Sequence, residues 1–190
     1  MSHKFDVSER HKLDNPQRRE MLPPLETLQN LGLQAGDMMA DIGCGIGYFT
    51  FPAASIVGSQ GKVFGLDIAP EMIAEVEAEK TRNGINNIET ICVDEQDLKL
   101  NSGSTTFALI SNVLHEVENL DRYITEIRRI LLVGGKLAVI EWEKKESVLG
   151  PPLSHRLDKL DLEKKLVHQG FKDVQNRSLR DEFYIITAIK

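Results

Sequence analysis

The sequence predicts one α/β domain built on a doubly wound, seven-stranded sheet with helices on both faces. Three observations lead to this prediction. Short apolar, β-branched runs alternate with amphipathic segments of helical spacing. The chain of 190 residues fits one compact domain, since domains mostly contain about 100–200 residues. The last two extended runs are joined by a link too short for a crossover, so they can only form an antiparallel hairpin.

The N-terminal part of the chain predicts two short helices followed by a strand. Asn15-Pro16 and Pro23-Pro24 resemble helix starts and Gly32 a helix stop, so residues 16–31 are expected to be helical. The run Met38–Ile42 is the first strand.

The next four strands are expected to lie parallel in the sheet. A crossover helix within Phe49–Val57 leads from the first strand to the second. The later strands are almost continuously apolar, which is typical of strands buried on both faces. The expected ranges are Lys62–Asp67, Ile88–Val93, Phe107–Ser111 and Lys136–Glu141.

A helix is predicted between the fourth and fifth strands, because apolar residues from Leu120 to Leu131 fall at helical spacing. Asn119 is placed to cap its start and Gly134-Gly135 to stop it. The remaining expected elements are a helix over Asp158–Val167 and two antiparallel strands, Lys172–Ser178 and Phe183–Ile189.

Composition excludes several classes of function. The 23 Lys+Arg against 29 Asp+Glu give a net charge of −6, which argues against a nucleic-acid partner. No apolar run approaches the roughly 18 residues of a membrane span, and the start lacks a signal-peptide core. Cys44 and Cys92 have no C-x-x-C partner and the histidines no metal spacing, so no metal site is expected. These features predict a cytoplasmic protein.

A glycine-rich turn follows the first strand and opens a helix. Asp41–Gly47 has the spacing G-x-G-x-G, followed by Tyr48, whereas the dinucleotide fingerprint is G-x-G-x-x-G. A pyrophosphate site is therefore disfavoured. The alternative ligand carries a ribose and an adenine but no phosphate, and it needs a carboxylate at the end of the second strand, where Asp67 stands.

Polar residues also end the next two strands. Asp94 follows the third strand and Asn112 the fourth. Each alone is most simply a solvated loop residue or a cap. Together with Asp67 and the glycine turn they place polar groups along the carboxyl edge, where open α/β sheets bind ligands.

These ordered motifs resemble the class I S-adenosylmethionine-dependent methyltransferases, nearest to the branch of ubiquinone/menaquinone and arsenite methyltransferases. The resemblance runs from about Leu33 to Phe171. It implies a Rossmann-like fold, S-adenosylmethionine as cofactor with S-adenosylhomocysteine as product, and in-line methyl transfer to a small-molecule acceptor. The motifs are Asp41–Thr50, Gly65–Met72, Val93–Leu98 and Asn112–Val117.

At the methionine end of the cofactor, the resemblance implies a lining of backbone groups from Gly43, Cys44 and Gly45. Asp41 would order this loop and the cofactor amine, and Asn112 would contribute nearby. The full implied cofactor set is Asp41, Gly43, Cys44, Gly45, Gly47, Asp67, Ile68, Met72, Asp94, Glu95 and Asn112.

At the adenosine end, the resemblance implies that Asp67 holds the ribose diol and Ile68 packs on the adenine. Asp94 would accept from the adenine amino group, and the Glu95 backbone would donate to the ring. One departure is Ala108, where many relatives carry an acidic residue.

Two residues after the fourth strand are candidates for a general base. His115 and Glu116 fall close to where the methyl group should lie, and a base is needed only when the acceptor must lose a proton. The alternative is that His115 only packs against the cofactor and Glu116 faces solvent. Trp142 is either an aromatic wall over the acceptor or a rim residue shielding the sheet, and Arg156 either meets an anionic substrate or is simply solvated.

Residues 1–32 are expected to act as a helical cap or lid on the single domain of residues 1–190, excluding water from the methyl group. Deleting residues 1–15 should then lower methyl transfer more than cofactor affinity. Two other functions stay open: a methyltransferase acting on protein or RNA, and a non-catalytic module that binds the cofactor. Nothing in the sequence predicts the oligomeric state.

Overall fold

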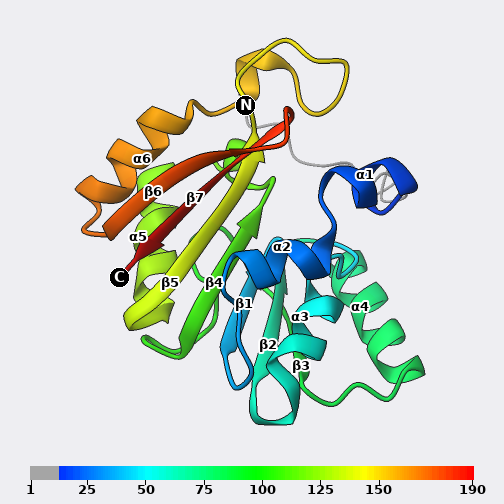
Figure 1. The fold of residues 1–190 in the computed structure, drawn as a ribbon. Coiled ribbons are helices and arrows are strands. Elements are labelled where there is room, and N and C mark those ends of the chain that lie inside the picture. Colours follow the sequence, from blue (N-terminus) through cyan, green and yellow to red (C-terminus); the bar gives the residue numbers. More distant parts are fainter. Residues whose placement is uncertain (1–12) are drawn as a thin grey trace.

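The computed structural model describes residues 13–190. Its strands form one seven-stranded sheet in the order β3-β2-β1-β4-β5-β7-β6, which is drawn in Figure 1. Strands β1 to β5 pair in parallel, and β7 runs antiparallel to β5 and β6. The predicted fold class is confirmed. The strands are β1 Met38–Ile42, β2 Lys62–Asp67, β3 Ile88–Cys92, β4 Thr105–Ser111, β5 Leu131–Trp142, β6 Lys172–Leu179 and β7 Phe183–Ile189.

Three of the described α-helices begin at a residue whose side chain caps them, namely Asn15, Asn119 and Asp158. Asn15 Oδ1 accepts from the Arg18 N–H at 2.9 Å, and Asn119 Oδ1 from the Arg122 N–H at 3.1 Å, so the predicted N-caps are confirmed. The α-helices are α1 Pro16–Met21, α2 Pro24–Asn30, α3 Thr50–Val57, α4 Pro70–Arg82, α5 Leu120–Ile130 and α6 Lys159–His168. Single 3₁₀ turns are η2 Gly58–Gln60, η3 Leu114–Glu116 and η4 Leu153–His155.

The predicted end of α5 is wrong. The helix ends at Ile130, and the chain enters β5 at once because Leu131 adopts an extended conformation and pairs with Thr105 of β4. The Leu131 side chain is fully buried, so the core draws it into the sheet. Gly134, at φ +81°, instead lies within β5, where the register against β4 shifts, and its N–H donates to the carbonyl of Lys190 at 3.1 Å.

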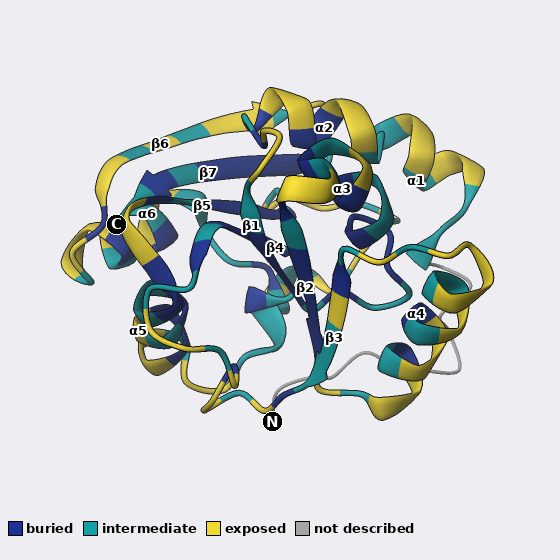
Figure 2. Ribbon diagram, turned by 90° about the horizontal axis from the view of Figure 1, so that it is seen from below, coloured by how far each residue is buried: buried dark blue, intermediate teal, exposed yellow. Residues whose placement is uncertain are grey.

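The sheet separates two hydrophobic clusters, because alternate side chains of each strand point to opposite faces. In β4, Ala108 and Ile110 pack with residues of α5 and α6, whereas Phe107 and Leu109 pack with residues of α2 and α3. Figure 2 shows the central strands as buried and the outer helix faces and β6 as largely exposed. Both faces of the sheet are thus covered, as a doubly wound fold requires.

The carboxyl ends of the parallel strands meet at one edge of the sheet. Helix α1 and the loop of residues 143–156 lie at this same end (Figure 1). Residues 13–32, the described part of the predicted lid, supply α1 and α2, whereas residues 1–12 lie outside the described part of the chain. Within residues 13–190, none of the helices has the length and apolar character needed to cross a membrane.

Candidate functional site

A pocket of about 320 Å³ opens at the carboxyl ends of β1, β2 and β4. This is the size expected of a small-molecule site. Most of the predicted site residues line it: Asp41, Gly43, Cys44, Gly45, Asp67, Ile68, Met72, Glu95, Asn112 and Glu116. Gly47, Asp94 and His115 are not part of this lining.

The glycine loop after β1 directs its N–H groups into the protein. The N–H groups of Gly43 and Cys44 donate to the Leu66 carbonyl at 2.8 and 2.9 Å. The Gly45 N–H donates to Asp67 Oδ2 at 2.8 Å. A phosphate cradle needs several N–H groups aimed at the ligand. In this loop the N–H groups of Gly43, Cys44 and Gly45 are engaged within the protein, which suits a ligand without phosphates.

Two glycines of this loop are required by its shape. Gly43 has φ +72°, and a Cβ there would lie 2.3 Å from Val113 Cγ2. Gly47 has φ +88°, and its Cβ would lie 2.5 Å from the ring of Phe51. Only glycine satisfies both conditions. Gly43 therefore forms part of the pocket wall, whereas Gly47 lies outside the lining and allows the loop to pack against Phe51.

The Asp67 carboxylate ties the ends of β1 and β2 together. Its Oδ2 accepts from Gly45 and its Oδ1 from the Ala69 N–H at 2.9 Å. The residue is 9% exposed. Burial raises the pKa of this carboxyl, while backbone N–H donors, those of Ala69 and Gly45 first among them, oppose the rise. A carboxylate held in this way is oriented before any ligand arrives.

Asp41 is a buried carboxyl behind the glycine loop. It is 2% exposed, and its Oδ2 accepts from Thr50 Oγ1 at 2.6 Å. Burial raises its pKa to about 7, the Thr50 hydrogen bond opposes this, and the charge of Asp67 adds to it. Near neutral pH the carboxyl is therefore balanced between its two protonation states. A cation bound beside it would favour the ionised form.

Arg18 of α1 is the one cationic side chain in the described lining of the pocket. Its guanidinium carbon lies 4.7 Å from the centroid of the Tyr48 ring. Its Nε is buried and has no hydrogen-bond partner among residues 13–190. Tyr48 in turn donates its hydroxyl proton to the Leu22 carbonyl at 2.8 Å, which fastens the end of α1 to the glycine loop. The predicted lid of residues 1–32 contains Arg18, but neither Arg18 nor Tyr48 was among the predicted cofactor-binding or catalytic residues.

The end of β4 holds two buried polar atoms that lack partners. Asn112 Oδ1 and Ser111 Oγ find no hydrogen bond among the described residues, although both residues line the pocket. Asn112 has φ +57°, a left-handed conformation that asparagine tolerates better than most residues. Its N–H donates to the Ile140 carbonyl at 2.8 Å, which holds the strained turn in place. Strain and unsatisfied polar atoms of this kind cluster at ligand sites.

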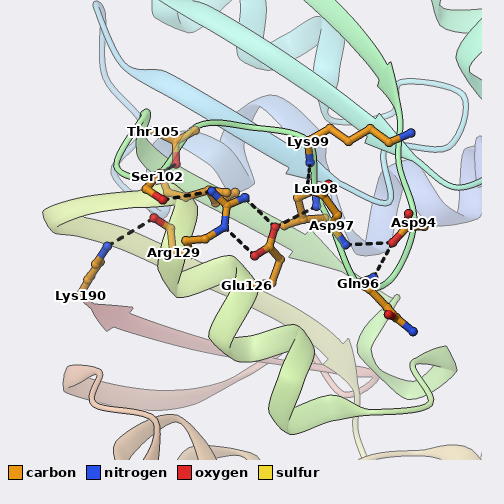
Figure 3. A network of polar contacts seen from close by, with 11 residues as sticks. Asp94, Gln96, Asp97, Leu98, Lys99, Ser102, Thr105, Glu126, Arg129 and Lys190 are labelled. Atoms are coloured by element: carbon orange, nitrogen blue, oxygen red, sulfur yellow. Dashed lines mark hydrogen bonds and ion pairs between the residues drawn. The ribbon is translucent and has the colours of Figure 1, made fainter.

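Asp94 lies beside the pocket, in an exposed hollow next to it. Its Oδ1 accepts from the N–H groups of Gln96 and Asp97 at 2.7 and 2.9 Å, as Figure 3 shows. The same loop is held to α5 by Glu126, which accepts from the Leu98 N–H at 2.9 Å (Figure 3). One oxygen of the Asp94 carboxylate therefore holds the turn formed by the residues that follow Asp94. Its contact with adenine stays a prediction.

His115 lies in η3 with its side chain 8% exposed. Its Nδ1 is 2.8 Å from Glu141 Oε2, and its Nε2 is 3.7 Å from Glu116 Oε1. Only Glu116 of these three reaches the pocket lining. Sequence reasoning placed Glu141 on a strand end without a link to His115. The sequence feature that could have indicated a role for Glu141 is its position directly after the apolar run of β5.

The loop after β5 differs from expectation at Arg156. This side chain is neither solvated nor aimed at a substrate, because it is 3% exposed and donates to carbonyl groups. Nε donates to Pro151 at 2.9 Å, and Nη1 donates to Glu143 at 3.0 Å and to Lys145 at 2.9 Å. Nη2 donates to the carbonyl of Leu149. The guanidinium therefore holds the loop from inside, since a buried cation must be fully hydrogen-bonded.

Trp142 packs against the sheet and does not line the pocket. Its ring centroid lies 4.4 Å from that of Phe183, and a Cβ on Gly150 would come within 2.6 Å of it. Of its two predicted roles, the structure therefore supports shielding of the sheet. Within residues 13–190 no group of three or more His, Cys, Asp or Glu side chains is arranged to hold a metal ion.

Comparison with known proteins adds a family to this geometry. The family model described as "Methyltransferase domain" matches residues 40–139. The chain is 28% identical over 116 residues to a demethylmenaquinone methyltransferase of Oceanobacillus iheyensis, covering 61% of this chain and 49% of that protein. It is 30% identical over 120 residues to a 2-phytyl-1,4-naphtoquinone methyltransferase of Synechocystis sp., covering 62% and 50%. A crystal structure of a SAM dependent methyltransferase from Aquifex aeolicus superposes with a TM-score of 0.92 at 27% identity, over 98% of this chain and 99% of that chain.

The chain spans about half the length of these two curated relatives. The family match runs from within β1 to within β5, so it contains the glycine loop, Asp67, Asn112 and His115. The whole fold, including the antiparallel hairpin, is shared with the Aquifex aeolicus protein. The chain therefore belongs to the class I S-adenosylmethionine-dependent methyltransferases.

Proposed function

We propose that this protein transfers a methyl group from S-adenosylmethionine to a small-molecule acceptor and releases S-adenosylhomocysteine. The observation that carries the proposal is the charge of the pocket lining. It contains the carboxyl groups of Asp41, Asp67, Glu95 and Glu116 and the single described cation Arg18. S-adenosylmethionine carries a sulfonium, an ammonium and one carboxylate, so its net positive charge and its one negative group match this lining.

The methionine end of the cofactor fits the wall made by α1, the glycine loop and the end of β4. The buried Nε of Arg18, which has no hydrogen-bond partner in the described part of the chain, suits the carboxylate. The Asp41 carboxyl, which lines the pocket, suits the ammonium, while the N–H groups of Gly43, Cys44 and Gly45 are already engaged within the protein. The unsatisfied Oδ1 of Asn112 adds a polar acceptor at the same end.

The adenosine end fits the wall made by β2, α4 and the loop after β3. Asp67 would accept from both ribose hydroxyls with lone pairs that its two backbone donors leave available. Ile68, which is 41% exposed, and the buried Met72 give apolar contact for the adenine. Glu95 and Asp94 border the far side of that position.

When bound, the cofactor supplies a methyl group already activated by its sulfonium sulfur. The protein has to align the acceptor and exclude water. Leu13 packs over the glycine loop, since a Cβ on Gly45 would lie 3.2 Å from Leu13 Cδ1. This contact and the α1 contacts of Arg18 support a covering role for residues 1–32. His115 and Glu116 are the proposed proton-handling residues.

We also propose that the protein acts in the cytoplasm and has no nucleic-acid partner. A net charge of −6 speaks against a nucleic-acid partner. The cysteines Cys44 and Cys92 are unpaired, which is usual in the reducing cytoplasm.

A calorimetric titration tests the cofactor half of the proposal. S-adenosylmethionine and S-adenosylhomocysteine are expected to bind and NAD is not, because the N–H groups of Gly43, Cys44 and Gly45 are engaged within the protein and are not donors for a pyrophosphate. Binding of NAD as tight as that of the sulfonium cofactor would overturn the assignment.

A transfer experiment tests the acceptor class. The protein is incubated with methyl-labelled cofactor and a cell extract separated into small-molecule, protein and RNA fractions. Label is expected in the small-molecule fraction. Label in protein or RNA would replace the proposed acceptor class, and binding without any transfer would favour a non-catalytic module.

A further inference from the structure

Glu141 is a buried carboxylate with an unusual set of contacts. Its side chain is 1% exposed at the carboxyl end of β5. Oε2 is bound to Nδ1 of His115 at 2.8 Å, whereas Oε1 is buried and has no hydrogen-bond partner among the described residues. Burying a carboxylate with one oxygen unsatisfied costs stability. A group maintained at that cost points to a role other than holding the fold.

The contacts of His115 connect this carboxylate to the pocket. Nδ1 faces Glu141, and Nε2 faces the opposite way, 3.7 Å from Oε1 of Glu116. Glu116 lines the pocket. The three side chains therefore form a row from the buried end of β5 to the wall of the pocket, with the imidazole ring in the middle.

The charges around the ring favour a base at Nε2. Burial by itself lowers the pKa of the His115 imidazole, whereas the hydrogen bond and the charge of Glu141 on β5 raise it. The Glu116 carboxylate in η3 adds to the rise, the Arg156 guanidinium after η4 opposes it, and the balance is a pKa above the usual value of histidine. With Nδ1–H donated to a carboxylate, the neutral ring must carry its lone pair on Nε2.

We propose that Glu141 is a positioning residue that fixes His115 with Nδ1 protonated and Nε2 available as a base, and that the acceptor is a phenol or enol. The inference rests on the proposed function. Only an acceptor that must lose a proton needs such a base, whereas a thiolate does not. The acceptor O–H bond breaks and its proton passes to Nε2 through the Glu116 carboxylate, which lines the pocket and lies 3.7 Å from Nε2, while the oxygen bonds the methyl group as the carbon–sulfur bond of the sulfonium donor breaks to leave a thioether. The positive charge lost at sulfur reappears on the imidazole, where Glu141 compensates it.

The first test uses nitrogen NMR of the His115 ring, which does not depend on activity. Wild-type protein is expected to show a protonated Nδ1, assigned by comparison with His115→Gln. In Glu141→Gln the amide oxygen can still accept from Nδ1, but the negative charge is gone, so the pKa of His115 should fall by about one unit. The matched control is Glu143→Gln, because Glu143 is a carboxylate two residues further along, bound to Lys159 Nζ at 2.9 Å and Ser178 Oγ at 2.7 Å. An unchanged His115 pKa in Glu141→Gln, or a ring with Nε2 protonated, overturns the positioning role.

The second test compares two acceptor probes, 1,4-dihydroxynaphthalene and benzenethiol. The rate with the phenol should rise as pH rises through the pKa of His115, because the base acts when deprotonated. In Glu141→Gln this rise should move to lower pH and the plateau kcat should fall about tenfold, with KM nearly unchanged. Benzenethiol ionises by itself and should show neither effect.

The possible results distinguish the positioning role of Glu141 from the proposed function of the protein. If Glu141→Gln lowers the stability of the protein but leaves the pH profile of the rate unchanged, Glu141 is only structural and the positioning role is overturned. Methylation of benzenethiol but not of the phenol overturns the acceptor class. Failure to bind S-adenosylmethionine in calorimetry overturns the proposed function, and the NMR measurement still decides what Glu141 does.

Discussion

The two sides of the pocket are built in different ways. On the β1–β2 side, the contacts that hold the site are backbone groups of the glycine loop, which bind the Leu66 carbonyl and the Asp67 carboxylate. On the β4–β5 side, the organising contact joins two side chains, His115 and Glu141, which are 26 residues apart. The first side depends on residues that stereochemistry restricts to a few types, and the second depends on a pair that only the sheet topology brings together. The first side is therefore readable in the sequence and the second is not.

Among the substitutions that test this comparison, Asp67→Ala is expected to have the largest effect on cofactor affinity. Asp67→Ala removes an acceptor for two ribose hydroxyls, each worth roughly 1.5–3 kcal/mol, so cofactor affinity should fall at least about a hundredfold. At saturating cofactor, kcat should change much less, which is the reverse of the pattern expected for Glu141→Gln. The measurement is calorimetry together with steady-state kinetics. The control is Asp94→Ala, expected to lose less than about tenfold, or about 1.4 kcal/mol. Equal losses in both variants would contradict the placement of Asp67 at the ribose.

The second prediction concerns the shape of the glycine loop. Gly43→Ala combines a strained φ with a clash against Val113, so cofactor affinity should fall about a hundredfold, from strain of about 1–3 kcal/mol plus displacement of the wall. Gly58→Ala is a matched control, since Gly58 also has a positive φ, +66°, but nothing lies within 4 Å of its Cβ. That control should lose about 1 kcal/mol of stability and no affinity. Denaturant unfolding and calorimetry separate the two quantities, and a normal affinity in Gly43→Ala would show that the loop adapts.

The third prediction is a pH dependence of cofactor binding. The pKa of Asp41 is about 7, and a bound ammonium would lower it, so the ionised form binds better. Affinity should therefore weaken as pH falls, by about tenfold between pH 8 and pH 6. Asp41→Asn should bind more weakly at pH 8 and lose most of this dependence. A dependence that survives unchanged in the variant would assign the titration to another group.

The smallest expected effects come from two tyrosine hydroxyls, one on each side of the sheet. Tyr48 donates to the Leu22 carbonyl at 2.8 Å and Tyr184 to the Leu157 carbonyl at 3.2 Å. Replacement of either by phenylalanine should cost about 1 kcal/mol of unfolding free energy, measured in urea. Only Tyr48→Phe should also weaken cofactor binding, because Tyr48 lines the pocket and holds α1. A loss of affinity in Tyr184→Phe as well would mean that the two sides are coupled.

Most of the fold was accessible from the sequence because most strands are apolar runs and most helices start at a capping side chain or at a proline in the first turn. The runs Met38–Ile42, Lys62–Asp67 and Phe183–Ile189 coincide with β1, β2 and β7. The end of α5 was predicted wrongly at Gly134-Gly135 because glycine is a local stop signal, whereas burial of Leu131 is a tertiary effect.

The site was predictable to the extent that it depends on local backbone shape. The glycine loop and Asp67 follow from spacing at strand ends, and both line the pocket. Arg18 reaches the pocket only because α1 docks on Tyr48, and no local pattern encodes that docking. A single carboxylate such as Glu141 is most often a solvated charge, so its burial could not be inferred from its position alone.

The buried guanidinium of Arg156 has a consequence for how this protein can change over evolution. Its partners are the carbonyl groups of Glu143, Lys145, Leu149 and Pro151, and every amino acid carries a carbonyl. Between these anchors, Ser147 is the residue whose side chain also holds the loop, because its Oγ donates to the Leu149 carbonyl and accepts from the Leu149 N–H, both at 3.0 Å. Substitutions can accumulate at the exposed positions 144, 145, 146 and 148 without altering the loop's course, while Arg156 and Ser147 must be kept. A mutant library that randomises these positions and keeps Arg156 would vary the rim of the molecule on an unchanged framework.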